Sequence, residues 1–252
     1  MLSADRINNL RRGVCFLFMI CLFPFNLWAQ SDDEFHWSIT PYIWGSNTKM
    51  DLTFRDTEIG EGDISFKDLL DVLDTAGMIH IETGKGNWSV FGDLTYLKTS
   101  DTTERVLLTV DTTSKQTFAD AAVAWWPEGA GSQFNLYAGL RYTGFDDRYR
   151  FNLGEIQVSQ RHTSSDYYDA LLGLRYRFDL AERWALLTRG DCSFGDSEGI
   201  CLLQANFAYT VGKSRRNRIL FGYQYKKAEF KDGDLVSKFT YHGPMAGFNF
   251  RF

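Results

Sequence analysis

The last eight residues of the chain, Met245 to Phe252, alternate between apolar and polar side chains and end on a phenylalanine. Successive side chains of a β-strand point to opposite faces, so this pattern predicts one aromatic and one polar face. The aromatic face carries Phe248, Phe250 and Phe252, and the polar face carries Gly247, Asn249 and Arg251. Such a strand suits a barrel with lipid outside and a polar lumen inside. A terminal strand of a soluble β-sandwich is the alternative.

The N-terminal segment has the composition of a secretory signal peptide. Arg6, Arg11 and Arg12 precede an apolar run at 14–23, and Ala29 ends a plausible cleavage site. We therefore predict a signal peptide at residues 1–29 and a single mature domain at 30–252. No mature segment has 18 consecutive apolar residues, so a membrane location requires a closed barrel.

The composition favours many strands over a helical enzyme. The chain is 16% aromatic and contains 22 glycines but only 4 prolines, as barrels with aromatic girdles and small lumen-facing residues require. Without the signal peptide the chain has 24 basic residues (27 less Arg6, Arg11 and Arg12) and 31 acidic residues (32 less Asp5), a net charge of −7. This acidity argues against a nucleic-acid partner.

Alternating segments separated by turn residues recur along the mature chain. They predict strands at 37–54, 76–83, 88–98, 105–126, 134–151, 156–178, 184–194, 200–211, 219–230 and 236–252. The predicted fold is an all-β transmembrane barrel of about ten antiparallel strands in up-and-down order. Eight or twelve strands remain open, because 105–126 and 156–178 could protrude or be split. Short connections after the even-numbered strands predict periplasmic turns, with both termini in the periplasm.

The first long connection contains the only strong helical pattern, over 63–74. Phe66, Leu69, Leu70 and Leu73 share one helical face, and Ser65 could cap the helix with Asp68 as its capping-box partner. The pattern fits a plug or lid at the extracellular mouth, a helix in the membrane interface, or a helix packed on the barrel rim.

Several motifs resemble a family of uncharacterised bacterial outer-membrane β-barrel proteins. They are Thr40-Pro41-Tyr42-Ile43-Trp44-Gly45, the segment 63–73, Gly92 to Tyr96, Ala138 to Tyr142, Arg189-Gly190-Asp191, Gly222 to Tyr225 and Gly243 to Phe248. The resemblance covers nearly all of the mature chain and implies an outer-membrane barrel without supplying an activity. The chain departs from the family at Cys192, near which a glycine-rich loop is expected. The C-terminus also resembles the barrel assembly signal in Gly247, Phe250 and Phe252, whereas Met245 stands where a polar residue is usual.

If the apolar face of each strand meets lipid, the inward face is rich in acids and arginines. This predicted lumen network consists of Glu82, Asp93, Asp120, Asp169, Asp191, Arg141, Arg175, Arg177, Arg189 and Arg251. Gly-Leu-Arg-Tyr occurs at both 139–142 and 173–176, placing Gly and Arg inward each time. Equal numbers of acids and arginines predict an ion-paired, filled lumen. A narrow pore for small polar solutes is the alternative.

The weak catalytic candidates are His80 and Glu82 on the second predicted strand and Asp93 on the third, near Ser89. A histidine oriented by a carboxylate could activate water or a nucleophile. These side chains are predicted to point inward, which argues against chemistry on lipid A. The four histidines lack ligand spacing, so we expect no metal site and no cofactor.

Only Cys192 and Cys201 remain after signal cleavage, and the periplasm is oxidising. The turn between them is centred at Asp196 and Ser197, so the two cysteines would face each other across a hairpin. We predict a disulfide that closes the fourth extracellular loop. Two free thiols are the alternative.

Together these features predict a monomeric barrel in the outer membrane, exported through the periplasm, with a structural or surface-interaction role. The expected partners are outer-membrane lipid, lipopolysaccharide and the barrel-assembly machinery. A narrow channel and an enzyme acting on envelope lipid or peptide remain the alternative functions, with no catalysis the preferred interpretation.

Overall fold

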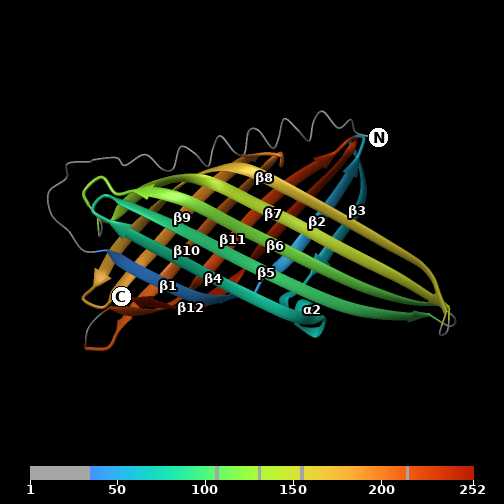
Figure 1. Cartoon of the computed structure of the whole chain (residues 1–252), viewed down its shortest axis with the longest axis horizontal. Helices are drawn as coiled ribbons and strands as arrows, with labels where there is room; N and C mark the ends of the chain where they lie inside the picture. The colour runs from blue at the N-terminus through green and yellow to red at the C-terminus, as the bar shows by residue number, and fades with distance from the viewer. Residues whose placement is uncertain (1–34, 106–107, 130–131, 154–155, 214–215) are drawn as a thin grey trace. The chain divides into compact units, whose positions relative to one another are not determined.

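The computed structural model describes residues 35–252 except 106–107, 130–131, 154–155 and 214–215. The predicted signal peptide, 1–29, lies outside the described residues. The described chain forms a closed ten-stranded antiparallel barrel with two additional strands and one short helix (Figure 1). This confirms the predicted fold class and the count of ten barrel strands.

The barrel strands follow one another around the wall in sequence order. They are β1 His36–Trp44, β4 Leu73–Lys85, β5 Trp88–Arg105, β6 Leu108–Trp125, β7 Phe134–Leu153, β8 Ile156–Ala181, β9 Trp184–Gly195, β10 Gly199–Val211, β11 Asn217–Asp232 and β12 Leu235–Arg251. Strand β1 pairs with both β4 and β12, and this pairing closes the barrel. The Phe252 amide donates to the Trp37 carbonyl over 3.0 Å, so the last residue meets the first strand at one rim.

The segment after β1 differs from the prediction. The expected first strand over 37–54 is interrupted at Gly45 and Ser46, and β2 (Asn47–Phe54) continues along β12. Strand β3 (Thr57–Ile64) then pairs back on β2, although a loop was predicted there. The turn between them has positive φ angles at Arg55 and Asp56 (47° and 62°), as tight two-residue hairpins require. The prediction of a loop was wrong because β3 carries glutamates and glycines in place of an apolar face.

Helix α2 (Phe66–Asp71) is shorter than predicted, since Leu73 already begins β4. The predicted capping box is present: the Asp68 amide donates to Ser65 Oγ, and the Ser65 amide donates to the Asp68 carboxylate. These hydrogen bonds hold the pKa of Asp68 below its ordinary value. The Phe66 amide donates to Asn47 Oδ1 over 2.7 Å, which places the helix beside the β1–β2 junction.

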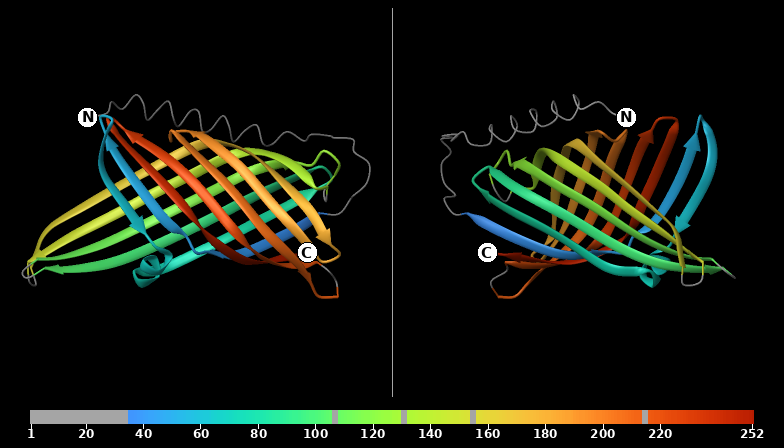
Figure 2. Two further views of the ribbon diagram at one scale, coloured as in Figure 1. Left: turned by 180° about the vertical axis from the view of Figure 1, so that it is seen from behind. Right: turned by 45° about the vertical axis from the view of Figure 1, so that its right-hand side comes forward.

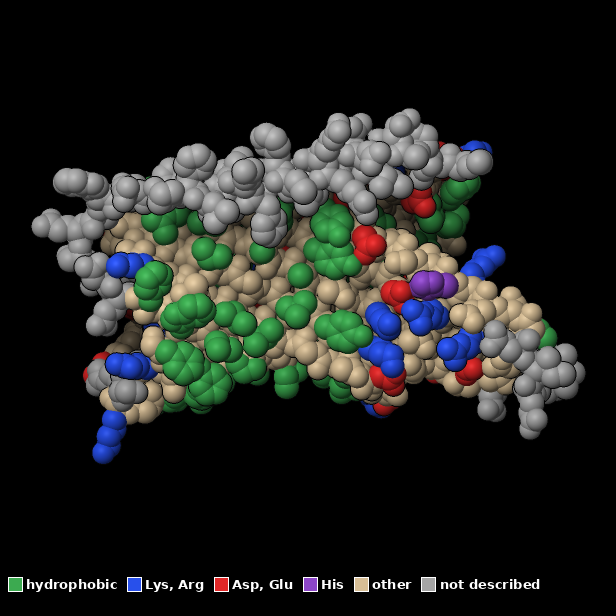
Figure 3. Space-filling view, in the orientation of Figure 1, with side chains coloured by type: hydrophobic (Ala, Val, Ile, Leu, Met, Phe, Trp, Pro, Cys, Tyr) green, Lys and Arg blue, Asp and Glu red, His purple; other side chains and the backbone are tan. Residues whose placement is uncertain are grey.

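The outer wall carries a belt of exposed apolar side chains. Over β5–β7 this belt consists of Trp88, Val90, Leu94, Val123, Trp125, Leu136 and Leu140. Strands β5–β8 continue past the belt into a charged extension (Figures 1, 2 and 3). Strand β8 has 26 residues, whereas a membrane crossing needs about 9–11. No helix among the described residues is long and apolar enough to cross a membrane.

Candidate functional site in the lumen

The half of the lumen at the short turns, which is predicted to be periplasmic and is called the periplasmic half below, contains a cavity of about 580 Å³ lined by inward side chains. It extends from Lys226 and Asp120 near mid-barrel to Gln133 and Arg251 at the rim where the short turns lie. The period of two along each strand alternates these lining residues with the lipid-facing belt. We therefore take this cavity and its surrounding charges as the candidate site.

A buried arginine–aspartate cluster lies at the inner end of the cavity. Arg141 Nε and Nη2 donate to the two carboxylate oxygens of Asp120 over 2.7 and 2.9 Å. Arg141 Nη2 also donates to Asp191 over 2.8 Å, and both of these side chains are fully buried. Arg189 donates to Asp120 and Asp191, each over 2.7 Å. The paired strands β6 and β7 are thereby joined to β9 through charge-assisted hydrogen bonds.

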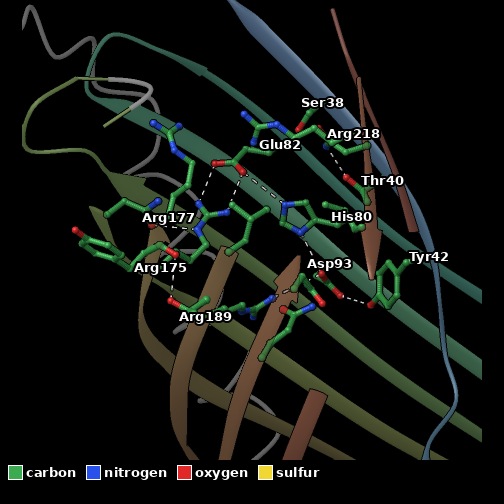
Figure 4. A pocket seen from close by; sticks show the side chains of 18 of the residues that line it. Ser38, Thr40, Tyr42, His80, Glu82, Asp93, Arg175, Arg177, Arg189 and Arg218 are labelled. Carbon is green, nitrogen blue, oxygen red and sulfur yellow. Dashed lines mark hydrogen bonds and ion pairs between the residues drawn. The ribbon is translucent and has the colours of Figure 1, made fainter. Parts of the chain in front are cut away.

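A second set of charges crosses the lumen from β4 to β8. Both guanidinium Nη atoms of Arg175 donate to Glu82 over 2.9 Å (Figure 4). Glu82 also accepts a 2.6 Å hydrogen bond from Ser89 Oγ. Glycine at 173 makes room for this arrangement, because a Cβ there would overlap the Tyr137 ring. Tyr137 in turn donates to Asp191 over 2.6 Å, and the Arg175 guanidinium carbon lies 5.6 Å from the centroid of its ring, so Tyr137 contacts both sets.

His80 is the central residue of the predicted catalytic group, and its ring lies between two carboxylates. Its Nδ1 atom is 3.0 Å from Asp93 Oδ2, and its Nε2 atom is 3.6 Å from Glu82 Oε2 (Figure 4). Asp93 also accepts a 2.8 Å hydrogen bond from the Tyr42 hydroxyl. A general base needs a ring nitrogen directed at the proton that it removes. Both nitrogens of His80 face carboxylates, so the geometry suits a positioned cation better than a base.

The structure brings most, but not all, of the predicted network residues together. Seven of them join the two sets of charges: Glu82, Asp93, Asp120, Arg141, Arg175, Arg189 and Asp191. Asp169 is instead buried near the β9–β10 turn, where it accepts hydrogen bonds from Ser193 and Ser197. Arg177 pairs with Asp179 at the rim, 3.0 Å apart. Arg251 lines the cavity mouth and has no carboxylate within 4.0 Å among the described residues.

Sequence reasoning missed two cations that line the cavity, Arg218 and Lys226. Both lie on β11, where Leu220 and Gln224 point inward, and every second residue of a strand points to the same side. Extending this alternation from Leu220 to Arg218 and from Gln224 to Lys226 would have placed both cations in the lumen. With them included, six arginines and lysines line the cavity against three acids, Glu82, Asp93 and Asp120. The cavity lining is therefore cationic, whereas the predicted network was charge-balanced.

The opposite half of the lumen, which is predicted to be extracellular and is called the extracellular half below, is filled by aromatic rings. This aromatic cluster consists of Phe118, Phe145, Tyr167, Phe230, Phe239 and Tyr241. Phe145 on β7 lies 5.4 Å from Phe230 on β11 and 5.9 Å from Phe239 on β12, measured between ring centroids. Strands β7 and β11 are not neighbours in the wall, so these contacts cross the lumen.

The predicted disulfide between Cys192 and Cys201 is present. The two residues are direct partners in the β9–β10 ladder, with Cα atoms 4.1 Å apart. Buried Ser193 and Ile200 beside them face the lumen, so the disulfide lies on the outer face of the barrel.

The chain is similar to solved outer-membrane barrels at low identity. The outer membrane protease OmpT from Escherichia coli matches with a TM-score of 0.46 and 10% identity, over 90% of this chain and 99% of that one. Ail of Yersinia pestis, solved with the heparin analogue sucrose octasulfate, matches with a TM-score of 0.39 and 10% identity, over 88% and 100%. We draw no functional argument from likenesses this distant.

No family model and no curated protein matches the chain, so the family resemblance seen in its motifs stays a prediction. The barrel assignment depends on the strand pairing of the chain itself, and the apolar belt supplies the lipid-facing surface. The closed barrel and its apolar belt identify the chain as an integral β-barrel, and the outer membrane is its expected location.

Proposed function

We propose that this protein is a sealed, non-conducting outer-membrane barrel with a structural and surface-interaction role. The observation that carries the proposal is the aromatic cluster, whose rings contact one another across the lumen between β7, β11 and β12. Hydrophobic constrictions exclude water and ions. A hydrated ion that enters the periplasmic cavity would have to shed its water to pass this cluster.

The test is conductance in planar bilayers. We expect no steady current from the native barrel, and ionic current after Phe145→Ala, Phe230→Ala and Phe239→Ala are combined. The matched control replaces two outward-facing rings, Phe207→Ala and Phe221→Ala, and should produce no current. A steady, ion-selective current through the native protein would favour the narrow-channel alternative instead.

We do not propose an enzyme, because the best catalytic candidate has both ring nitrogens directed at carboxylates. Activity that disappears in folded His80→Ala or Asp93→Ala protein, with lipid A or a peptide as substrate, would reverse this assignment.

The interaction surface that we propose is a cationic hollow on the outer wall, directly beyond the apolar belt. This hollow of about 230 Å³ is lined by Lys98, Asp111, Thr113, Lys115, Arg148 and Arg150. Lysines 98 and 115 are direct cross-strand partners, and like charges in that position repel. Lys98 is paired with Asp74 over 2.8 Å, whereas Lys115 has no carboxylate within 4.0 Å among the described residues, so an anion could pair with Lys115. Basic side chains also gather on this extension in Figure 3. The position and charge fit the phosphates of outer-leaflet lipopolysaccharide.

Binding to vesicles that contain lipopolysaccharide tests this partner. Replacing Lys115→Glu and Arg150→Glu should weaken the binding about tenfold or more, because each phosphate contact contributes charge-assisted hydrogen bonds. Arg183→Glu, at the opposite rim, is the control and should bind as the native protein does. Equal binding by all three proteins would contradict the proposal.

A further inference from the structure

Lys226 is a buried cation without an acidic partner. Its side chain points inward from β11, and the residue is 5% exposed. No ion pair or hydrogen bond involves its ammonium group in the part of the chain that the structure describes; its closest charge-related contact is the Phe118 ring, whose centroid lies 4.2 Å from Nζ. A cation–π contact returns about 2 kcal/mol when desolvated, less than the several kcal/mol that burying an ion costs.

The acids nearest to Lys226 are already committed to other cations. Asp120 accepts three hydrogen bonds from Arg141 and Arg189, and Asp93 lies against His80 and Tyr42. The Lys226 ammonium group is therefore an unpaired charge at the surface of the cavity. An anion that entered the cavity would supply the missing partner.

The rest of the cavity is also arranged for an anion. Arg218 and Arg251 line its mouth, and neither has a carboxylate within 4.0 Å among the described residues. Cationic clefts with low-dielectric walls raise the local concentration of anions and their association rates. An anion from the periplasm would thus be drawn toward Lys226 from the rim.

The lining of the same cavity also contains apolar side chains. Four of them, Leu187, Leu202, Leu220 and Met245, come from β9 to β12, where polar side chains such as Gln204 and Gln224 also line the cavity. A volume of about 580 Å³ falls within the range of pockets that hold small organic molecules. A ligand that contacts both Lys226 and these apolar side chains has one anionic group and an apolar body.

We propose that the periplasmic cavity binds an amphipathic monocarboxylate, with its carboxylate on Lys226 and its apolar body along the β9–β12 wall. A single ammonium, acting as a point charge, suits a singly charged head. The guanidinium of Arg141, which could hold a phosphate through two hydrogen bonds, is already taken up by Asp120 and Asp191. This ligand site goes beyond the sealed barrel proposed above and does not depend on the seal.

The test uses the folded barrel in lipid nanodiscs and octanoate as the probe. Calorimetric titration should show saturable octanoate binding to the native protein, and Lys226→Met should weaken it about tenfold to a hundredfold, the range expected for a charge-assisted hydrogen bond. The matched control is Lys227→Met, whose side chain is the exposed outward neighbour on the same strand; it should bind like the native protein. Octanol, which lacks the charge, should not distinguish native protein from Lys226→Met.

A second measurement separates loss of binding from loss of folding. Lys226→Met removes an unpaired buried charge, so the variant without ligand should resist urea at least as well as the native barrel. Octanoate should then raise the unfolding midpoint of the native protein but not that of the variant, because a ligand stabilises only the state that binds it. Equal octanoate binding by native protein and Lys226→Met, or no saturable binding at all, would overturn the proposal.

Discussion

The two halves of the lumen are built from different side chains and have different consequences. The extracellular half is filled by the aromatic cluster, four of whose six members are phenylalanines, which have no side-chain hydrogen bonds to satisfy. The periplasmic half holds the ion pairs and the cavity of about 580 Å³. Apolar rings can fill space from any direction, whereas buried charges must meet partners at set distances. The proposed seal and the proposed ligand site therefore lie at separate levels of the lumen.

The largest expected effect comes from breaking the buried ion pairs. Arg141→Met removes one of the two guanidinium groups that Asp120 and Asp191 share, and removing one partner of a buried pair costs about 4 kcal/mol. We expect this loss in the free energy of unfolding, measured by urea titration of the barrel in lipid vesicles. Arg251→Met, which removes a cavity arginine without an acidic partner, should change the free energy little. If the two variants lose equal stability, the periplasmic half does not depend on pairing.

The aromatic half should instead lose stability when a buried ring is truncated and leaves a void. Phe230 is 4% exposed, and its ring centroid lies 4.4 Å from that of Tyr167. Truncation of a buried ring costs about 3 kcal/mol through lost burial and the void that remains, so Phe230→Ala should lower the free energy of unfolding by that amount. The control is Phe207→Ala, on the lipid-facing wall and 42% exposed. A smaller loss for Phe230→Ala than for Phe207→Ala would contradict a packed seal.

The periodicity of the sequence predicted the strands and the direction of their side chains. Phe250 alternates with Asn249, which indeed turns inward and donates to Thr40 over 2.7 Å. The hairpin of β2 and β3 was not predicted, because an edge strand such as Thr57–Ile64 needs no apolar face and its glutamates and glycines resemble a loop.

The charges of the lumen were harder to predict than its strands. The direction of a side chain follows from the period of two along its strand. The pairing of charges depends on the shear of the barrel and on the depth of each residue in the lumen, and a single sequence contains neither. Asp169 and Asp191 were both predicted to face arginines, yet only Asp191 contacts one. Division of the lumen into aromatic and charged halves likewise depends on which inward residues share a level.

The smallest expected effect is that of the outer disulfide, which tests whether the extracellular half needs a covalent clamp. Removing it by Cys192→Ser and Cys201→Ser should cost about 1–2 kcal/mol, because the ring is small and the ladder already aligns the strands. Asp169 also holds the turn from inside, accepting a 2.6 Å hydrogen bond from Ser197 Oγ. Amide exchange should therefore quicken at the β9–β10 turn, while conductance stays absent. Current from the double variant would mean that the seal depends on the disulfide as well as on the aromatic cluster.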